Sequence, residues 1–394
     1  MNKKDLVSTV SPETTPSSAE EDLHSRWQDV VQRRSFLKGL GMAGAALSAG
    51  ALLTGKAEAM PQHKGKLHRS DVALLRFAAA AELIESDLWQ QYNELGGVDG
   101  GNTAYAAALS NLDEDMPQYI SDNTDDEISH AAFLNAYLQA RGEEPVNLDA
   151  FRTLPSSRAT GAKQIGRLTN LMNLNVDLSW YTRYRSTQNP DLGATFKGPF
   201  TITNQPAIPL SDDDTPPDQP QPVPPVGPQQ NRMQAIANTA GFHFAFIEQG
   251  GSSLYPSFSL KATDLEVLRI LLSIGGVEIA HFGLWHDKGG NAVAEGLAGV
   301  VDPETGLTFP NLNDLNSELA QTNLILPEPC DFLSKNLPQC SVIRPTLTQN
   351  AGAVATIKAF TADNLFFGQT GRFFDLVMTL AHEADAAKRQ FDGM

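Results

Sequence analysis

The sequence predicts an all-α protein: a bundle of four long helices with a long crossover between the second and third, and an additional C-terminal helix. Two observations predict this fold. Several stretches repeat apolar residues every three or four positions, which is the period of an amphipathic helix. A proline-rich stretch without periodicity divides these helices into two pairs. A long connection at that place lets both pairs pack antiparallel in one bundle.

The first pair of helices is expected at about 71–95 and 125–140. Ser70 or Asp71 can cap the first helix, and the glycines at 96–97 end it. Helical spacing places five residues on one face of this helix: Leu75, Ala79, Glu82, Ser86 and Trp89. In the second helix, which stops at Gly142, four residues share a face: Glu127, His130, Leu134 and Tyr137.

The connection between the two pairs is expected to be helical at first and irregular later. An apolar stripe predicts a helix over about 162–186: Ile165, Leu168, Leu171, Met172 and Val176. Periodicity is then lost over about 187–230, and seven of the twenty residues at 211–230 are proline. This Pro-rich insertion predicts an extended or disordered linker, with recruitment of a partner domain as the alternative.

The second pair of helices is expected at about 232–254, with Pro256 as its stop, and at about 262–285. Residues of about 290–349 are rich in Pro, Asn and Gly and predict irregular structure. A final helix is expected at about 371–391, with a shorter one before it at about 351–366. Residues 290–394 therefore form a C-terminal extension of a domain that spans 60–394.

One pattern occurs twice along the bundle helices. Ala79-x-x-Glu82-x-x-x-Ser86-x-x-Trp89 recurs as Ala245-x-x-Glu248-x-x-x-Ser252-x-x-Tyr255. Each copy is followed by a Glu-x-x-His, which is Glu127/His130 after the first and Glu278/His281 after the second. The small residues on either side of each lone glutamate leave room for a metal ion beside the carboxylate.

The repeated pattern predicts a two-metal site. Glu and His at i and i+3 lie on one helical face and can converge on one point, to which a facing glutamate adds a third ligand. Two such halves give six ligands: Glu82, Glu127, His130, Glu248, Glu278 and His281. Carboxylates and imidazoles with open positions suit iron or manganese, and ligand type leaves zinc or copper possible. A third Glu-x-x-His, Glu21/His24, lies near the N-terminus and shows that the motif alone is weak evidence.

Other polar and aromatic residues near these motifs are expected to be structural. Glu85 is expected to be solvated or to cap the helix, because it points away from Glu82. The imidazoles of His243 and His286 belong to other faces, and Trp285 and Tyr137 are expected in the core rather than as redox relays. His382-Glu383 on the last helix has no pairing motif. The paired glycines at 250–251 and 275–276 favour close helix packing over a local break that opens the site.

The six ligand positions resemble those of the ferritin-like superfamily. The leader, the Pro-rich insertion and the extended C-terminal part resemble its exported ferritin-like-domain branch, which includes desiccation-related proteins. The motifs that carry this resemblance cover roughly residues 70–290. The resemblance implies a centre of two metal ions, iron first and manganese second, in an oxidoreductase that acts with O2 or peroxide. The alternative is a non-catalytic scaffold that protects under desiccation or other stress.

Residues 1–59 resemble a bacterial twin-arginine signal peptide. Arg33 and Arg34 precede a weakly apolar run at 39–55, and small residues at 57–59 suit a signal peptidase. Gln32 departs from the family pattern, where Ser or Thr is usual. The alternative is a retained membrane anchor, although the run is short for a spanning helix. The resemblance implies passage of the folded protein through the twin-arginine translocation machinery to the periplasm or outside the cell.

The net charge, the hydropathy of the chain and the two cysteines indicate which partners and which disulfide to expect. The net charge of −17 comes without a basic stripe, which argues against nucleic acid and anionic lipid as partners. No segment after the leader is expected to be apolar enough to cross a bilayer. The two cysteines, Cys330 and Cys340, lie in a Pro-rich loop and are expected to form a disulfide in an oxidising compartment.

Overall fold

The structure is a computed structural model that describes residues 65–182, 198–214, 229–291, 299–312, 334–340 and 352–390. All of these belong to one compact unit, residues 47–394. The expected signal peptide with Arg33 and Arg34 lies outside the described residues, as do Cys330 and most of the Pro-rich insertion.

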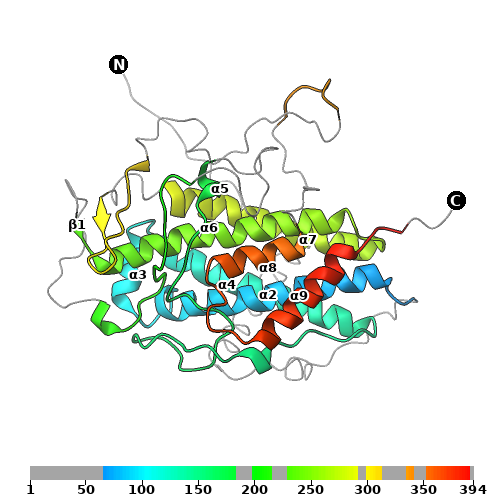
Figure 1. The fold of residues 1–394 in the computed structure, drawn as a ribbon, viewed down its shortest axis with the longest axis horizontal. Helices are drawn as coiled ribbons and strands as arrows, with labels where there is room; N and C mark the ends of the chain where they lie inside the picture. The colour runs from blue at the N-terminus through cyan, green and yellow to red at the C-terminus, as the bar shows by residue number, and fades with distance from the viewer. Residues whose placement is uncertain are drawn as a thin grey trace, which may run out of the picture. The chain divides into compact units, whose positions relative to one another are not determined.

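Four long helices form the bundle and confirm the predicted fold class. They are α2 (Arg69–Gly96), α4 (Met116–Ala140), α6 (Arg232–Ser259) and α7 (Leu265–Trp285). α2 packs mainly on α4, and α6 mainly on α7 (Figure 1). The long crossover between α4 and α6 separates the two pairs, as predicted.

Side-chain caps mark several helix starts, and α2 is capped by His68, not by Ser70 or Asp71 as predicted. Asp71 instead ties the two helix pairs together. The side chains of Asn231 and Asp264 accept hydrogen bonds from backbone N–H groups at the starts of α6 and α7. Asp71 in the first turn of α2 accepts from the backbone of Thr263 and Asp264, at 2.8 and 3.0 Å. This buried carboxylate thereby fixes the α6–α7 turn against the start of α2.

Helix α6 lies at the centre of the fold. Nearly all of its residues are buried, because α3 (Thr103–Ser110), α7 and α8 (Ala353–Ala362) contact it from different sides. A helix that is covered all round needs apolar or small residues on every face, and α6 is rich in Ala, Phe, Gly and Ser. The helix also continues through Pro256 to Ser259, so the predicted stop at Pro256 is wrong. The buried side chains of Tyr255 and Phe258 hold this last turn in the core.

The predicted helix over about 162–186 is also wrong. Within the described residues this stretch is irregular, apart from the short helix α5 (Ser179–Thr182). Its backbone makes an antiparallel bridge between Leu154 and Arg167 and another between Leu174 and Gln205. Asp87 of α2 accepts from the backbone N–H groups of residues 168 and 169, both at 2.9 Å. These tertiary hydrogen bonds replace the helical ones, and the apolar stripe is buried against the bundle without a helix.

The remaining elements complete the cover of the bundle. Short 3-10 turns occur at Asp149–Phe151 and Asp212–Asp214, and a π-helical turn, His286–Asn291, follows α7. β1 (Gln229–Gln230) pairs in parallel with β2 (Val300–Val301). The predicted C-terminal helices are confirmed as α8 and α9 (Gly371–Ala386), and α9 packs on α2.

Helix α7 corrects one expectation about membranes. By length and composition alone it is apolar enough to cross a bilayer, because an 18-residue window within Leu265–Lys288 has a mean hydropathy of 1.6. The expectation that no segment after the leader passes this test is therefore wrong. In the bundle, however, α7 packs along α6 and brings buried Glu278 toward the other three long helices.

Candidate metal centre

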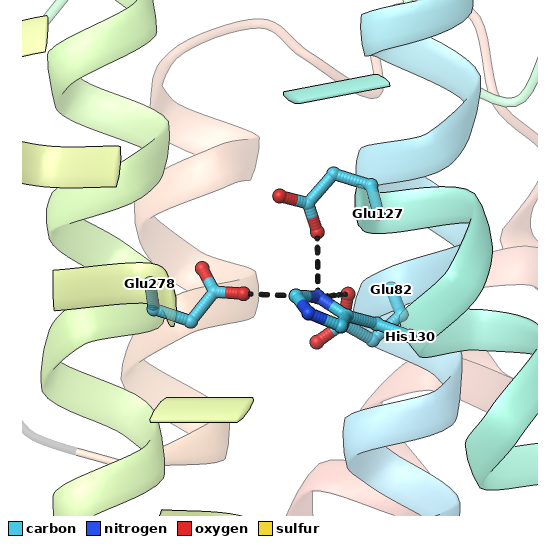
Figure 2. A group of neighbouring side chains, drawn as sticks. All are labelled: Glu82, Glu127, His130 and Glu278. Atoms are coloured by element: carbon cyan, nitrogen blue, oxygen red, sulfur yellow. Dashed lines mark hydrogen bonds and ion pairs between the residues drawn. The ribbon is translucent and has the colours of Figure 1, made fainter. Parts of the chain in front are cut away.

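The six predicted ligands converge between the four long helices. The four glutamates contribute one carboxylate from each of α2, α4, α6 and α7, and each is at most 1% exposed. His130 lies one turn after Glu127 on α4, and His281 one turn after Glu278 on α7, which is the i and i+3 placement that the sequence predicts. Figure 2 shows Glu278 opposite His130, with the glutamates of α2 and α4 beside it.

The distances within the cluster match two sets of metal ligands. His130 Nδ1 lies 3.3 Å from Glu82 Oε2, 3.3 Å from Glu127 Oε2 and 3.4 Å from Glu278 Oε1. Donor atoms that bind one ion at roughly 2.0–2.2 Å lie about 3.0–3.5 Å from one another. Each of the three oxygens is thus spaced from the imidazole nitrogen as ligands of one cation are, and the four residues offer ligand atoms within 4.8 Å of one another.

A second set lies next to the first and shares residues with it. His281 Nδ1 lies 3.2 Å from Glu127 Oε1 and 3.3 Å from Glu248 Oε2. Glu127 thus turns one carboxylate oxygen to each histidine, and Glu278 also belongs to both sets. The two imidazole rings are 6.5 Å apart between centroids. Glu127 and Glu278 are placed to bridge two cations, while Glu82 and Glu248 each serve one.

Burial and mutual repulsion disfavour charge on the bridging carboxylates. Burial is the main cause that raises the pKa of Glu127 to about 7, and the charges of Glu248 and Glu82 add to it. Burial also raises the pKa of Glu278 well above its usual value, again with repulsion from neighbouring carboxylates. Such a cluster is unfavourable unless positive charge enters it.

The two histidines supply part of that positive charge. Burial alone would lower the pKa of His130, but the adjacent Glu82 overcomes this effect and raises it. The same balance, with Glu248, raises the pKa of His281. Burial likewise pushes the pKa of Glu82 upward, but His130 reverses this and leaves it below the usual value. Two imidazolium charges cannot neutralise four carboxylates, so the ligand set favours further cations.

Orphaned polar atoms fit the same conclusion. Glu278 Oε2 is buried and has no polar partner among the described residues. Glu82 Oε2, Glu248 Oε2 and Glu278 Oε1 make no hydrogen bond there either, and each faces only an imidazole Nδ1 at 3.3–3.4 Å. Buried polar atoms are normally satisfied. Carboxylate oxygens that converge with so few donors are what hard divalent or trivalent metal ions bind, so the residues fit a dimetal group.

Hydrogen bonds from neighbouring residues orient the ligands. Asn123 Nδ2 donates to Glu127 Oε1 at 2.9 Å and to Glu248 Oε1 at 3.0 Å, and its Oδ1 accepts from Trp285 Nε1 at 2.7 Å. Tyr255 on α6 donates its hydroxyl to Glu82 on α2. On Glu82 and Glu248 these donors bind the oxygen that faces away from the histidine, whereas Glu127 Oε1 also faces His281.

His281 has an orienting partner of its own. Its Nε2 lies 3.1 Å from Oδ2 of Asp126, the residue before Glu127. When Nε2 donates its hydrogen to this carboxylate, Nδ1 keeps its lone pair for a metal ion. The residue that corresponds to Asp126 in the second half, before Glu278, is Val277.

Glycines allow the helices to approach closely at the cluster. A Cβ atom at Gly251 would overlap Glu278 Oε2, and one at Gly275 would lie 2.6 Å from Tyr255 Cβ. One glycine of each pair, Gly251 and Gly275, therefore serves close packing, as expected, whereas a Cβ at Gly250 or Gly276 would fit. Helix α6 runs unbroken through Gly250 and Gly251.

Comparison with known proteins agrees with this geometry. A family model described as a ferritin-like domain matches residues 70–288, which is more than half of the chain. The chain belongs to the ferritin-like domain family. No curated protein and no solved structure gave a match.

The ferritin-like match covers all four bundle helices and all six candidate ligands. It ends within the π-helical turn after α7, so α8 and α9 lie outside it. The ferritin-like part and the candidate metal centre therefore coincide in the chain.

Glu85 corrects the expectation of a solvated residue. It is only 4% exposed and therefore lies in the core. Burial raises its pKa well above the usual value, and the carboxylates of the cluster add to this effect. Glu85 is thus a fifth buried carboxyl group beside the ferritin-like centre, although its oxygens lie outside both ligand sets.

The other residues that the sequence singles out lie in the core or on the surface, as expected. His243 is fully buried and hydrogen bonded, and His286 packs against Tyr181 at 5.7 Å between ring centroids. Trp285 is in the core, and Tyr137 donates to Glu266 at 2.7 Å. His382 and Glu383 are exposed on α9. Cys340 is exposed, and its pairing with Cys330 stays a prediction.

Sequence reasoning missed Asn123 and Asp126. The predicted second helix begins at about 125, but α4 begins at Met116, with Pro117 in its first turn. Proline near the first helical position is a start signal that would have placed Asn123 one turn before Glu127 on the same face. Helix α3 was missed as well, although Asn102 before an Ala-rich run is an N-cap signal.

Proposed function

We propose that this chain is an exported dimetal oxidoreductase that acts with O2 or peroxide, with iron as the first candidate metal and manganese as the second. The observation that carries the proposal is the shared position of Glu127. Its two carboxylate oxygens lie 3.3 and 3.2 Å from the Nδ1 atoms of two different histidines. A protective scaffold without a metal would have no need of six buried, converging polar side chains.

The residues of the centre have distinct tasks in this function. Glu127 and Glu278 hold both metal positions, Glu82 and His130 complete one, and Glu248 and His281 complete the other. Bound iron supplies one-electron redox steps and the positions at which O2 or peroxide reacts.

The surrounding residues fix the ligands and limit water. Asn123 and Tyr255 hold oxygens of the carboxylates, and Asp126 orients the His281 ring. The stacked rings of Trp89 and Trp285, 5.3 Å apart, close one side of the site with fully buried apolar surface. Preorganised ligands in a largely dry site strengthen electrostatic interactions with the metal ions.

Export is supported by the leader sequence alone. The twin arginines, the weakly apolar run at 39–55 and the small residues at 57–59 support translocation of a folded, metal-loaded protein to the periplasm or beyond. Membership of the desiccation-related branch rests on the same leader and on the Pro-rich insertion. N-terminal sequencing of exported protein should find Met60 or a residue near it. Export that persists unchanged in the Arg33→Lys/Arg34→Lys variant would refute the twin-arginine route.

The enzymatic function is tested by metal content and oxygen chemistry together. The purified full chain should bind two iron ions and consume O2 or peroxide. The Glu127→Ala/Glu278→Ala variant should lose both properties while keeping its helical circular dichroism. If this variant protected test enzymes against drying as well as the wild type does, and the wild type consumed no oxidant, the scaffold function would replace the enzymatic one.

A further inference from the structure

Three fully buried aromatic rings lead away from the metal centre. The ring centroids of Trp285 and Trp89 lie 5.3 Å apart with nearly parallel planes, and those of Trp89 and Tyr92 lie 5.7 Å apart. Phe244 packs against all three rings, at 4.7–4.9 Å between centroids. The rings therefore form a continuous path through the core between α7 and α2.

One end of this path touches the ligand shell. Trp285 donates from Nε1 to Asn123, whose amide in turn donates to the carboxylates of Glu127 and Glu248. The indole of Trp285 is thus connected with each of two candidate metal ligands, Glu127 and Glu248, through two hydrogen bonds in series.

The other end is a buried chain of three polar groups. The Tyr92 hydroxyl lies 2.7 Å from His243 Nδ1, and His243 Nε2 lies 3.0 Å from Asp363 Oδ2. If Tyr92 donates to Nδ1 and Nε2 donates to the Asp363 carboxylate, every polar hydrogen of the chain has an acceptor. The opposite direction would leave the buried Tyr92 hydroxyl hydrogen without an acceptor in the described part of the chain.

We propose that Trp285 and Trp89 carry a single electron from Tyr92 to the metal centre, and that Tyr92 passes its phenolic proton to His243 as the electron leaves. The inference rests on the proposed function, because the oxidant is the metal centre after its reaction with O2 or peroxide. Tyr92 loses one electron and its O–H proton, and the metal centre gains the electron. The proton forms the Nδ1–H bond of His243, whose Nε2–H proton moves to Asp363.

Electrostatics favours this step. Before it, the chain contains the buried carboxylate of Asp363; after it, the chain contains a neutral tyrosyl radical, a neutral imidazole and a neutral carboxylic acid. Burial raises the pKa of Asp363 well above its usual value, so this group takes up the proton readily. Burial also lowers the pKa of His243 to about 3, so the imidazole passes the proton on instead of keeping a second one.

The aromatic relay itself has no route for protons. Trp89 Nε1 is buried and has no hydrogen-bond partner among the described residues. An oxidised Trp89 therefore keeps its N–H proton and can pass on only an electron. Core packing alone would explain the ring contacts, but it would not require a hydroxyl, an imidazole and a carboxyl group buried in contact with one another.

Laser photoionisation of the indoles tests the path without any metal. The ring centroids of Trp180 and Tyr181 lie 5.6 Å apart and those of Tyr119 and Trp285 6.4 Å apart, so every protein in the comparison carries Trp180→Phe and Tyr119→Phe to remove these two other pairs. In the metal-free full chain, transient absorption should show the indolyl radical decaying as a tyrosyl radical grows. Tyr92→Phe should abolish the growth, and His243→Gln or Trp89→Phe should reduce it severalfold. Tyr105→Phe is the matched control, since Tyr105 is equally buried but donates to the backbone of Ala207 at 2.6 Å.

The same variants then connect the path to the metal centre. Iron-loaded protein that is mixed with O2 and frozen should give the EPR signal of a tyrosyl radical that Tyr92→Phe removes and Tyr105→Phe leaves unchanged. Equal tyrosyl growth with and without Tyr92 after the flash would overturn the inference. Two bound irons and O2 consumption without a Tyr92-dependent radical would also overturn it while leaving the proposed function in place. Absence of iron binding would instead refute the proposed function, and the flash experiment would still decide whether the path exists.

Discussion

The two halves of the metal centre have the same ligands in different surroundings. In the half formed by α2 and α4, Glu82 receives a hydrogen bond from Tyr255 of the other half. In the half formed by α6 and α7, Glu248 receives its hydrogen bond from Asn123, and His281 contacts Asp126. Each half is therefore completed by residues of the other, and the repeated pattern yields two unequal sets of candidate metal ligands.

The aromatic residues at the end of each repeat also differ in role. Tyr255 binds a ligand carboxylate, whereas its counterpart Trp89 stacks on Trp285 and Phe244. Likewise, Gly251 makes room for Glu278, whereas its counterpart Glu85 is a buried carboxyl group. A duplicated motif thus preserves the ligands while the residues between them adapt to different neighbours.

The largest effect is expected when both bridging carboxylates are removed. The Glu127→Ala/Glu278→Ala variant should bind no iron, because each residue belongs to both ligand sets. The metal-free fold should persist and become more stable, since the variant removes buried like charges. Elemental analysis and thermal unfolding measure the two effects. Glu144→Ala/Glu383→Ala removes two exposed carboxylates and serves as the control. Unchanged iron content in the bridging variant would rule out these residues as ligands.

A methyl group at Gly251 should disturb the second half of the centre. Gly251→Ala forces the Glu278 carboxylate aside, and overpacking of this kind costs about 1–3 kcal/mol in the free energy of unfolding. Gly276→Ala is the matched control, because a Cβ there meets no atom within 4 Å. It should stabilise helix α7 by about 0.5–1 kcal/mol. Denaturant unfolding and iron titration of both variants compare the positions, and equal behaviour of the two would show that Gly251 has no special role.

Substitutions of the residues that orient the ligands should affect one metal position more than the other. Asn123→Ala should weaken the position of Glu248, and Tyr255→Phe that of Glu82, each by about 10–100-fold in metal affinity. A stepwise metal titration with a spectroscopic readout should show a different step affected in each variant. Loss of the same step in both variants would contradict separate roles for the two halves.

A smaller effect is expected at Asp126. Asp126→Asn should lower the affinity for metal at His281 by about tenfold. Asp126 is half exposed, so water can partly replace its hydrogen bond. Asp122→Asn, one helical turn earlier on α4, controls for the loss of a surface charge. Competition with a chelator measures the affinity, and an Asp126→Asn protein that matches this control would show that the His281 contact has no influence.

The pH dependence of the metal-free protein should be the most modest effect. The pKa of Glu127 is about 7 in the folded protein, above its ordinary value of 4.5. The folded state therefore holds more protons than the unfolded state between these values, so stability falls as pH rises from about 4.5 to 7. Thermal unfolding should show this loss without metal and show it reduced with iron bound. The double alanine variant should lack this contribution, and an identical pH profile in that variant would contradict it.

The ligand set could be predicted from the sequence because it depends on local spacing. Glu127 and His130 are one helical turn apart on any helix. The one further assumption was that the two helix pairs pack with their ligand-bearing faces toward each other. Asn123 escaped prediction because its role depends on Trp285 and Glu248, which are more than a hundred residues away. Glu85 was wrongly expected to be solvated, because the spacing along one helix does not show which of its faces other elements bury.

The fold was predictable where apolar periodicity and burial agree. The stripe at 165–176 has helical spacing, but Asp87 and the bridge at Leu174 hold its backbone in an irregular path. Helix α6 passes through Pro256 because the buried Tyr255 and Phe258 stabilise its last turn. In both places tertiary contacts outweigh local preference. The spacing of residues in a single sequence does not reveal these contacts.

The central claim is that one repeated motif builds two unequal metal positions. Mössbauer spectroscopy of the full chain, loaded with ferrous iron in the absence of oxygen, tests this most directly. We expect two irons per chain that give two signals of equal area and different quadrupole splitting, with Asn123→Ala altering only one of them. A protein that binds no iron, or one whose two irons give a single signal, would contradict the account.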